Sequence, residues 1–269
     1  MHKFYNEDLK TTLMFDPTGI FDNPKYAKLA FDNKETFSQG NPFPHISFDD
    51  FLDEQLIKEL RDNFPDYNDD VSWHVRDTEN IKKRYQADDT KLPKILRLML
   101  REFNSKQFLL FLEALTGIEY LIPDPYFING GVHMSKTGDY LGVHADFNWN
   151  HMIQAHRRVN VLVYLTESWQ EEWKGALELW EPEATKPVKM IYPAFNRAIV
   201  FQTSGKSLHG HPVPLQTPDG EYRRVLNLYY YSRHKDENYQ EDPHFTKYTR
   251  QSSEFSIDIK KKYETSSNQ

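Results

Sequence analysis

The residues best suited to chemistry lie in the segment GDYLGVHADF, from Gly138 to Phe147. In an extended segment, the side chains of His144 and Asp146 point to the same side because one residue separates them. An imidazole and a carboxylate at one strand end can share a metal ion if a third ligand comes from elsewhere. The best candidate for it is His209, in the later segment TSGKSLHGHP. Two histidines and one carboxylate leave half an octahedron open, as non-haem Fe(II) sites do.

A purely structural explanation of the same residues also stays open. Asp146 would then cap a turn, and His209 would be a packed loop histidine.

A second candidate is Arg223, which opens the segment RRVLNLYYYS. Alternation places Arg223, Asn227 and Tyr229 on one face of a strand and Arg224 on the other. An arginine beside a metal pocket offers a planar fork for a carboxylate, whereas an arginine at an exposed strand start needs no such role. Alternation alone leaves open which of the two arginines points inward.

Composition limits the class of protein. The chain has 269 residues and 38% hydrophobic residues, enough for one large β-rich domain or two smaller ones. The net charge of −7 argues against non-specific binding to nucleic acid or to an acidic membrane surface. The chain has no cysteine, which excludes disulfides and a thiolate nucleophile and is compatible with Fe(II) chemistry. Because no leader-like start and no membrane-length apolar run is seen, we expect a cytoplasmic protein.

Helical patterns come first in the chain, at 51–64, 92–103 and 107–115, with Ser105 as a cap and Gly117 as a terminator. Short strand-like runs follow from about residue 118, which favours a sandwich or barrel over an α/β fold. The predicted strands are 42–48, 126–134, 140–144, 158–165, 176–180, 188–192, 197–202 and 223–232.

Three other stretches show little periodicity. We expect residues 1–40 to form an irregular arm whose aromatic residues pack on the domain, and residues 66–91 to be rich in loops. The chain from Arg233 onward is expected to lie along the surface. The aromatic residues of the arm are Phe15, Phe21, Tyr26 and Phe31.

From about residue 42 to 232 the chain resembles the Fe(II)- and 2-oxoglutarate-dependent oxygenases of the prolyl-4-hydroxylase-like branch. The matching segments occur in the expected order: PFPHISFDDFL, GDYLGVHADF, RRVNVLVYLTESW, KGALELW, FNRAIVFQTSGKSLHGHPVPL and RRVLNLYYY. The resemblance implies a mainly β fold with flanking helices (α+β), built on a double-stranded β-helix, or jelly-roll. It also implies an N-terminal arm (1–40), a single oxygenase domain (41–232) and a C-terminal polar extension (233–269). Within the domain, helices would span about 51–116 and the jelly-roll about 118–232.

The resemblance further implies residue roles. His144, Asp146 and His209 would be the catalytic iron ligands. Arg223 would pair with the distal carboxylate of 2-oxoglutarate, with help from Tyr164. Other co-substrate contacts are implied at Asn160, Leu177 and Tyr229. Contacts with substrate or co-substrate are expected at His133, Tyr140, Phe147 and Trp149, although each of these side chains could equally be a packing residue.

Some positions depart from the family pattern or compete within it. Thr166 replaces an asparagine and Lys174 replaces a glycine, both at the periphery. His211 is near enough to compete with His209 as a ligand, but the family pattern and the proline after His211 favour His209. Halogenating relatives carry a small residue in place of Asp146, so its presence favours hydroxylation.

The expected function is hydroxylation of an unactivated C–H bond, with Fe(II) as cofactor, 2-oxoglutarate and O2 as co-substrates, and succinate and CO2 released. A free amino acid or amino-acid-like small molecule is the favoured substrate, because no added peptide-binding module is visible. The alternative is a prolyl hydroxylase acting on a peptide or protein. A cupin-like metalloenzyme without 2-oxoglutarate also stays open, although Arg223 and Tyr164 argue against it. A non-catalytic ligand-binding jelly-roll stays open as well. We expect no nucleic-acid or membrane partner, and no pattern predicts the oligomeric state.

Overall fold

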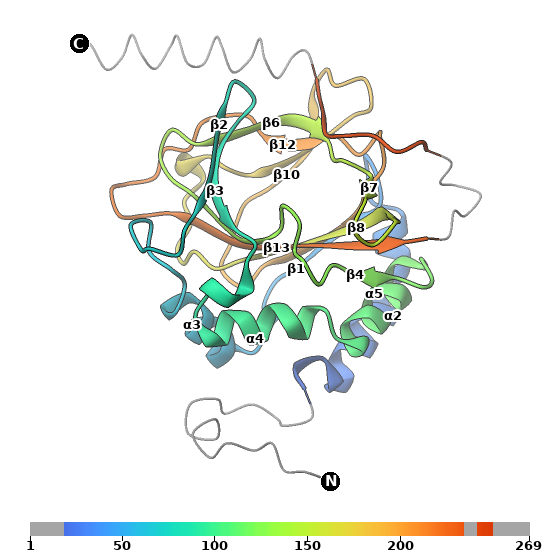
Figure 1. Ribbon diagram of the computed structural model, residues 1–269. Helices are drawn as coiled ribbons and strands as arrows, with labels where there is room; N and C mark the ends of the chain where they lie inside the picture. The colour runs from blue at the N-terminus through green and yellow to red at the C-terminus, as the bar shows by residue number, and fades with distance from the viewer. Residues whose placement is uncertain (1–18, 234–240, 250–269) are drawn as a thin grey trace, which may run out of the picture.

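Two β-layers face each other, and helices cover the outer face of one of them (Figure 1). The computed structural model describes residues 19–233 and 241–249. The strands form one curled antiparallel sheet of the jelly-roll type, which confirms the predicted fold class. The layer beside the helices has the order β1 (His45–Phe48), β11 (Ala198–Gln202), β8 (Ala155–Tyr164), β13 (Arg223–Ser232) and β5 (Gly131–Ser135).

The second layer carries the candidate ligands. Its order is β6 (Tyr140–Ala145), β12 (His209–His211), β9 (Leu177–Trp180) and β10 (Pro187–Ile191). Strand β3 (Ile81–Gln86) pairs with both β5 and β6 and so connects the layers. The remaining elements are β4 (Ile122–Pro123), β7 (Trp149–Asn150), η1 (Ile20–Asp22), η2 (Asp89–Lys91) and η3 (Glu171–Trp173).

Strand β8 shows how the sequence positions the interior. All ten of its residues are buried, because one face packs on the helices and the other lies between the two layers. Val159, Val161 and Val163 belong to the core shared with the helices. Leu162 and Tyr164 alternate with them and point between the layers. Packing against the helices therefore holds β8 in place, and its opposite face can carry the side chains of a site.

The predicted helices are present as α3 (Glu54–Asp62), α4 (Lys94–Phe103) and α5 (Lys106–Thr116). Ser105 caps α5 by accepting a hydrogen bond from the Phe108 backbone N–H. Gly117 ends the helix in the left-handed conformation, with φ of 72°. The buried faces of α3, α4 and α5 form one core with β8 and β13.

The expectation of an irregular N-terminal arm is wrong for residues 24–38, which form helix α2 (Pro24–Ser38). Asn23 and Pro24 begin this helix: the Asn23 side chain accepts from the Lys25 N–H, and Pro24 takes the first helical position. Tyr26 packs as expected, and so does Phe21, but Phe31 is 82% exposed. Phe15 lies outside the described residues.

The expectation of loops at 66–91 is wrong in part, because β2 (His74–Thr78) and β3 form a hairpin. Of the strand sequence IKKRYQ, Ile81, Lys83 and Tyr85 line the cavity, so the face toward the cavity is not a continuous apolar stripe. Near the C-terminus, β14 (Lys247–Tyr248) pairs with β6 rather than running freely over the surface. Tyr248 stands opposite His144 in that pairing.

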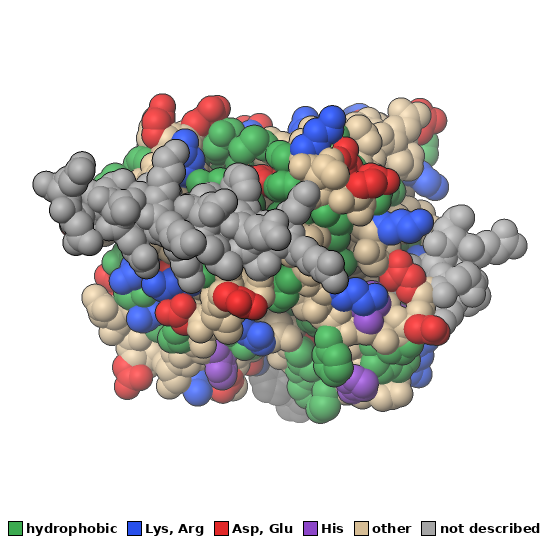
Figure 2. All heavy atoms as spheres, turned by 90° about the horizontal axis from the view of Figure 1, so that it is seen from above, with side chains coloured by type: hydrophobic (Ala, Val, Ile, Leu, Met, Phe, Trp, Pro, Cys, Tyr) green, Lys and Arg blue, Asp and Glu red, His purple; other side chains and the backbone are tan. Residues whose placement is uncertain are grey.

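The face seen in Figure 2, on the side away from the helices, mixes acidic, basic and hydrophobic side chains where it is not covered by grey. No single charge sign dominates the visible part of that face. Among the described residues, no helix is long and apolar enough to cross a membrane.

Candidate active site

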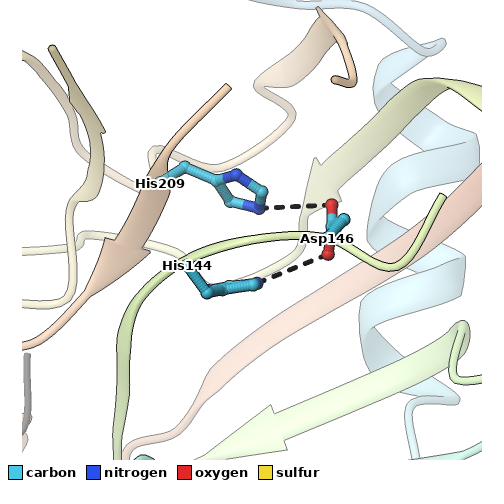
Figure 3. A group of neighbouring side chains, drawn as sticks. All are labelled: His144, Asp146 and His209. Carbon is cyan, nitrogen blue, oxygen red and sulfur yellow. Dashed lines mark ion pairs between the residues drawn. The ribbon is translucent and has the colours of Figure 1, made fainter. Parts of the chain in front are cut away.

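His144, Asp146 and His209 converge between the two layers (Figure 3). Strands β6 and β12 are antiparallel neighbours, and His144 and His209 lie directly opposite each other. The His144 Nε2 atom is 3.4 Å from Asp146 Oδ1, and the His209 Nε2 atom is 3.4 Å from Asp146 Oδ2. The two histidines are 5% exposed and Asp146 is 9% exposed. The cluster is therefore compact and nearly sealed from bulk water.

The proton positions of the two imidazoles favour a bound cation. The Nδ1 atom of His144 is 2.9 Å from the Gly142 carbonyl oxygen, and that of His209 is 2.9 Å from the Ser207 carbonyl oxygen. A carbonyl only accepts, so each Nδ1 carries the proton and each Nε2 presents a lone pair. Burial lowers the pKa of His209 to about 4, despite the opposing charge of Asp146. Two lone pairs and a carboxylate thus face one another, and a cation relieves that repulsion.

Asp146 is held by two side chains from β8. Arg157 Nη2 is 2.9 Å from Asp146 Oδ2, and Asn160 Nδ2 donates to the same oxygen at 2.8 Å. Arg157 Nε also donates to Asn160 Oδ1 at 2.8 Å, which closes a triangle. Burial is the largest single effect and would raise the pKa of Asp146, but Arg157, His209 and His144 together outweigh it and hold the pKa well below the usual value. The carboxylate is therefore ionised and fixed in orientation, as a metal ligand must be.

Arg223 points into the cavity, and Arg224 lies on the other face of β13. Arg223 is 5% exposed, donates from Nη2 to the Tyr164 hydroxyl at 2.9 Å, and donates from Nε to the Gly175 carbonyl at 3.0 Å. Gly175 has φ of 69°, and a Cβ there would lie 2.3 Å from a Leu215 methyl carbon. Among the described residues, no carboxylate pairs with this guanidinium, so it is available to an acidic ligand.

One cavity brings together most of the residues singled out from the sequence. Besides the metal cluster and Arg223, its lining includes Asn160, Leu177, Tyr229, His133 and Phe147. Tyr164 reaches this group through its hydroxyl contact with Arg223.

Two expected contacts are not brought to the cavity. Tyr140 is buried and donates its hydroxyl to the Thr78 carbonyl at 2.9 Å, so it supports the β2–β3 hairpin. Trp149 packs its ring 4.6 Å from that of His156. Neither side chain lines the cavity.

Sequence reasoning missed several lining residues. Arg76, Lys83 and Tyr85 come from the hairpin that was expected to be loops, and Tyr248 comes from β14. The available signal in the sequence was the spacing of Ile81, Lys83 and Tyr85, which at every second position would share one face of a strand. His211 also lines the cavity but lies outside the three-residue metal cluster.

The comparisons with known proteins agree with this geometry. Residues 130–231 match the family model of the 2OG-Fe(II) oxygenase superfamily. The chain is 24% identical over 190 residues to a prolyl 3,4-dihydroxylase OGFOD1 from Ostreococcus tauri, a match that covers 63% of this chain and 34% of that protein. The chain thus spans about a third of that relative's length. The crystal structure of a Pseudomonas putida prolyl-4-hydroxylase aligns with a TM-score of 0.52 and 18% identity, over 77% of this chain and 98% of that one.

Fold and site together define a jelly-roll protein with a His-Asp-His cluster that could hold a metal ion. Residues 130–231 match one class of proteins, the 2OG-Fe(II) oxygenase superfamily, and the fold is a jelly-roll like that of the prolyl-4-hydroxylase structure. Fe(II) is the cofactor of this class, and 2-oxoglutarate and dioxygen are its co-substrates.

Proposed function

We propose that this protein hydroxylates an unactivated C–H bond of a free amino acid or amino-acid-like small molecule. The observation that carries the proposal is the placement of three metal-ligand atoms and an unpaired arginine in one cavity. These groups suit a metal ion and a keto-diacid together. One end of the diacid would chelate the metal ion, and its distant carboxylate would pair with the arginine. Within the chain, we propose residues 41–232 as the oxygenase domain, with helix α2 of the preceding segment packed on its core, and 233–269 as an extension.

Each group in the cavity has a proposed task. His144, Asp146 and His209 would hold Fe(II), and Arg223 with Tyr164 would bind the distal carboxylate of 2-oxoglutarate. Bound Fe(II), with 2-oxoglutarate and dioxygen, supplies the oxidising power, and succinate and CO2 are released. Asn160 and Arg157 would orient the carboxylate ligand.

Apolar side chains would form the walls of the co-substrate pocket. Leu162, Leu177 and Val225 line the cavity and pack in one hydrophobic cluster. Such walls keep water from the reacting groups and strengthen the interaction of Arg223 with a carboxylate.

A second candidate substrate is a prolyl residue in a peptide or protein. It is favoured by the similarity to a relative named as a prolyl 3,4-dihydroxylase and by the likeness to a prolyl-4-hydroxylase fold. Phe147 and Tyr229 line the cavity, and their ring centroids are 6.2 Å apart, so they offer an apolar surface to either kind of substrate.

The proposal is tested by anaerobic titration of the protein with Fe(II) and 2-oxoglutarate, following the weak visible charge-transfer band of the chelate. We expect the band in the wild type and its loss in Asp146→Ala. Metal binding without a band would favour a cupin-like enzyme that does not use 2-oxoglutarate. Absence of metal binding would favour a ligand-binding jelly-roll. Product formation retained in Asp146→Ala would overturn the ligand assignment.

A further inference from the structure

Lys83 is a lysine on the wall of the cavity with no acidic partner among the described residues. It lies on β3, on the same face as Ile81 and Tyr85, and all three line the cavity. The exposed neighbour Arg76, opposite Lys83 in the hairpin, lines the same wall near the mouth. The sequence-adjacent Lys82 points the other way, toward Asp77 at 4.0 Å.

One of the three N–H groups of Lys83 is used within the protein. Its Nζ atom lies 3.1 Å from His133 Nδ1. The other ring nitrogen of His133 is 3.1 Å from the Asn129 carbonyl oxygen and so carries the ring proton. His133 is therefore neutral and accepts from the ammonium group, which leaves the positive charge of Lys83 uncompensated.

The charges around the cavity do not balance. Of the described residues, four with cationic side chains line it, and Asp146 is the single carboxylate among them. Asp146 is already paired with Arg157 and would in addition hold the metal. Burial is the main cause that lowers the pKa of Lys83 to about 7, and the neighbouring arginines lower it further, whereas the charge of Asp146 opposes them. The cationic residues are Arg76, Lys83, Arg157 and Arg223.

The co-substrate does not remove this imbalance. Under the proposed function, one carboxylate of 2-oxoglutarate meets Arg223 and the other chelates the metal, so both are used. Two residues of the cavity lining also carry buried polar atoms without a hydrogen-bond partner among the described residues, His211 Nδ1 and Asn227 Oδ1. A cation and unsatisfied polar atoms in one cavity indicate a further polar ligand.

We propose that Lys83 binds the carboxylate of the primary substrate, so that the substrate is a free α-amino acid rather than an internal residue of a peptide. The inference rests on the proposed function and narrows its substrate class. A free carboxylate is present in every α-amino acid and is absent from an internal peptide residue. The neutral partner of Lys83 leaves two N–H donors for such a group.

The experiment uses the full chain as wild type, Lys83→Met, and Lys82→Met as a matched control on the opposite face of β3. The first readout is the anaerobic affinity for 2-oxoglutarate in the presence of Fe(II). The second is the stimulation of succinate formation by the twenty L-α-amino acids and by their N-acetyl amides. The amides keep each side chain and remove the carboxylate.

We expect at least one free amino acid to stimulate wild type and its amide to fail. In Lys83→Met, the amino-acid concentration for half-maximal stimulation should rise about 30-fold. The affinity of Lys83→Met for 2-oxoglutarate should equal that of wild type, and Lys82→Met should match wild type in both readouts. Three results overturn the inference: weaker 2-oxoglutarate binding in Lys83→Met, equal stimulation by acid and amide, or no stimulation by any free amino acid. If wild type forms no chelate band, the proposed function itself fails, and the inference with it.

Discussion

Asn160 donates a hydrogen bond from Nδ2 to Asp146 Oδ2 at 2.8 Å, so β8 orients a side chain that follows β6. The sequence resemblance implies a co-substrate contact for Asn160. The geometry gives it a further task, because Arg157 and Asn160 together fix the carboxylate that faces both histidines.

Replacing Asn160 by Ala should weaken Fe(II) binding about 10- to 100-fold, the range typical of lost partners of metal ligands. Competitive titration with a metal indicator measures the change. Asn227→Ala is the control, since Asn227 lines the same cavity but bonds to Tyr229 instead. Equal Fe(II) affinities in wild type and Asn160→Ala would show that Asn160 does not support the ligand.

His209→Ala and His211→Ala should separate the two histidines of β12. Only His209 presents a nitrogen to the cluster with Asp146. We therefore expect His209→Ala to lose Fe(II) binding by more than about 100-fold, beyond the range for residues behind a ligand, and His211→Ala to keep it. Metal content after dialysis checks both proteins. The reverse pattern would assign the ligand to His211.

Arg223→Met should weaken 2-oxoglutarate binding by about 2 kcal/mol or more, which is about 30-fold, because a buried charged contact is lost. Arg224→Met is a matched control on the opposite face of the same strand. Anaerobic titration of the Fe(II) protein gives both affinities. A similar loss in the two variants would point to a general effect on β13 rather than to a carboxylate anchor.

Glu178→Gln should make stability less dependent on pH. Burial raises the pKa of Glu178 from 4.5 to about 7, opposed by the hydrogen bond from Trp180 Nε1. The folded state therefore holds this proton more tightly, and the stability it contributes below pH 4.5 is lost as the pH rises through 7. The variant should gain up to about 3 kcal/mol over wild type between pH 4.5 and 8.

Urea unfolding of the metal-free proteins at several pH values measures that difference, with the exposed Glu183→Gln as control. A constant difference between wild type and Glu178→Gln across this range would contradict the assignment of a raised pKa.

Asn148→Ala should release the segment 241–249 from the domain. The Asn148 side chain donates to the Asp242 carbonyl at 2.9 Å and accepts from the His244 N–H at 2.6 Å. Loss of both bonds should cost about 1–3 kcal/mol locally. Hydrogen exchange at Thr249, whose N–H donates to the Val143 carbonyl, should accelerate while exchange in β8 stays slow. Unchanged exchange at Thr249 would show that β14 holds without Asn148.

The sequence was informative where a strand has a buried apolar face. Strands β8 and β13 carry long alternating runs, because each packs on the helix core with one face, and both were predicted close to their observed bounds. Alternation placed Arg223 and Tyr229 on one side of β13, and both line the cavity.

The sequence was uninformative where a strand faces a polar cavity or is very short. The β2–β3 hairpin lines the site with Arg76 and Lys83, so its composition resembles a loop. Strand β12 has three residues, and there is no room for a side chain at Gly210, because a Cβ there would lie only 2.7 Å from the Leu141 carbonyl oxygen. That close approach depends on the neighbouring strand, which the local pattern of β12 cannot reveal.

The pairing of His144 with His209 across β6 and β12 also sets the order in which the protein can mature during translation. A ribosome-bound chain that has emerged only as far as β11 carries two of the three metal-ligand groups and lacks the strand that brings the third. The arginine strand β13 and the edge strand β14 come later still. A complete set of candidate metal ligands therefore exists only after β12 has left the ribosome.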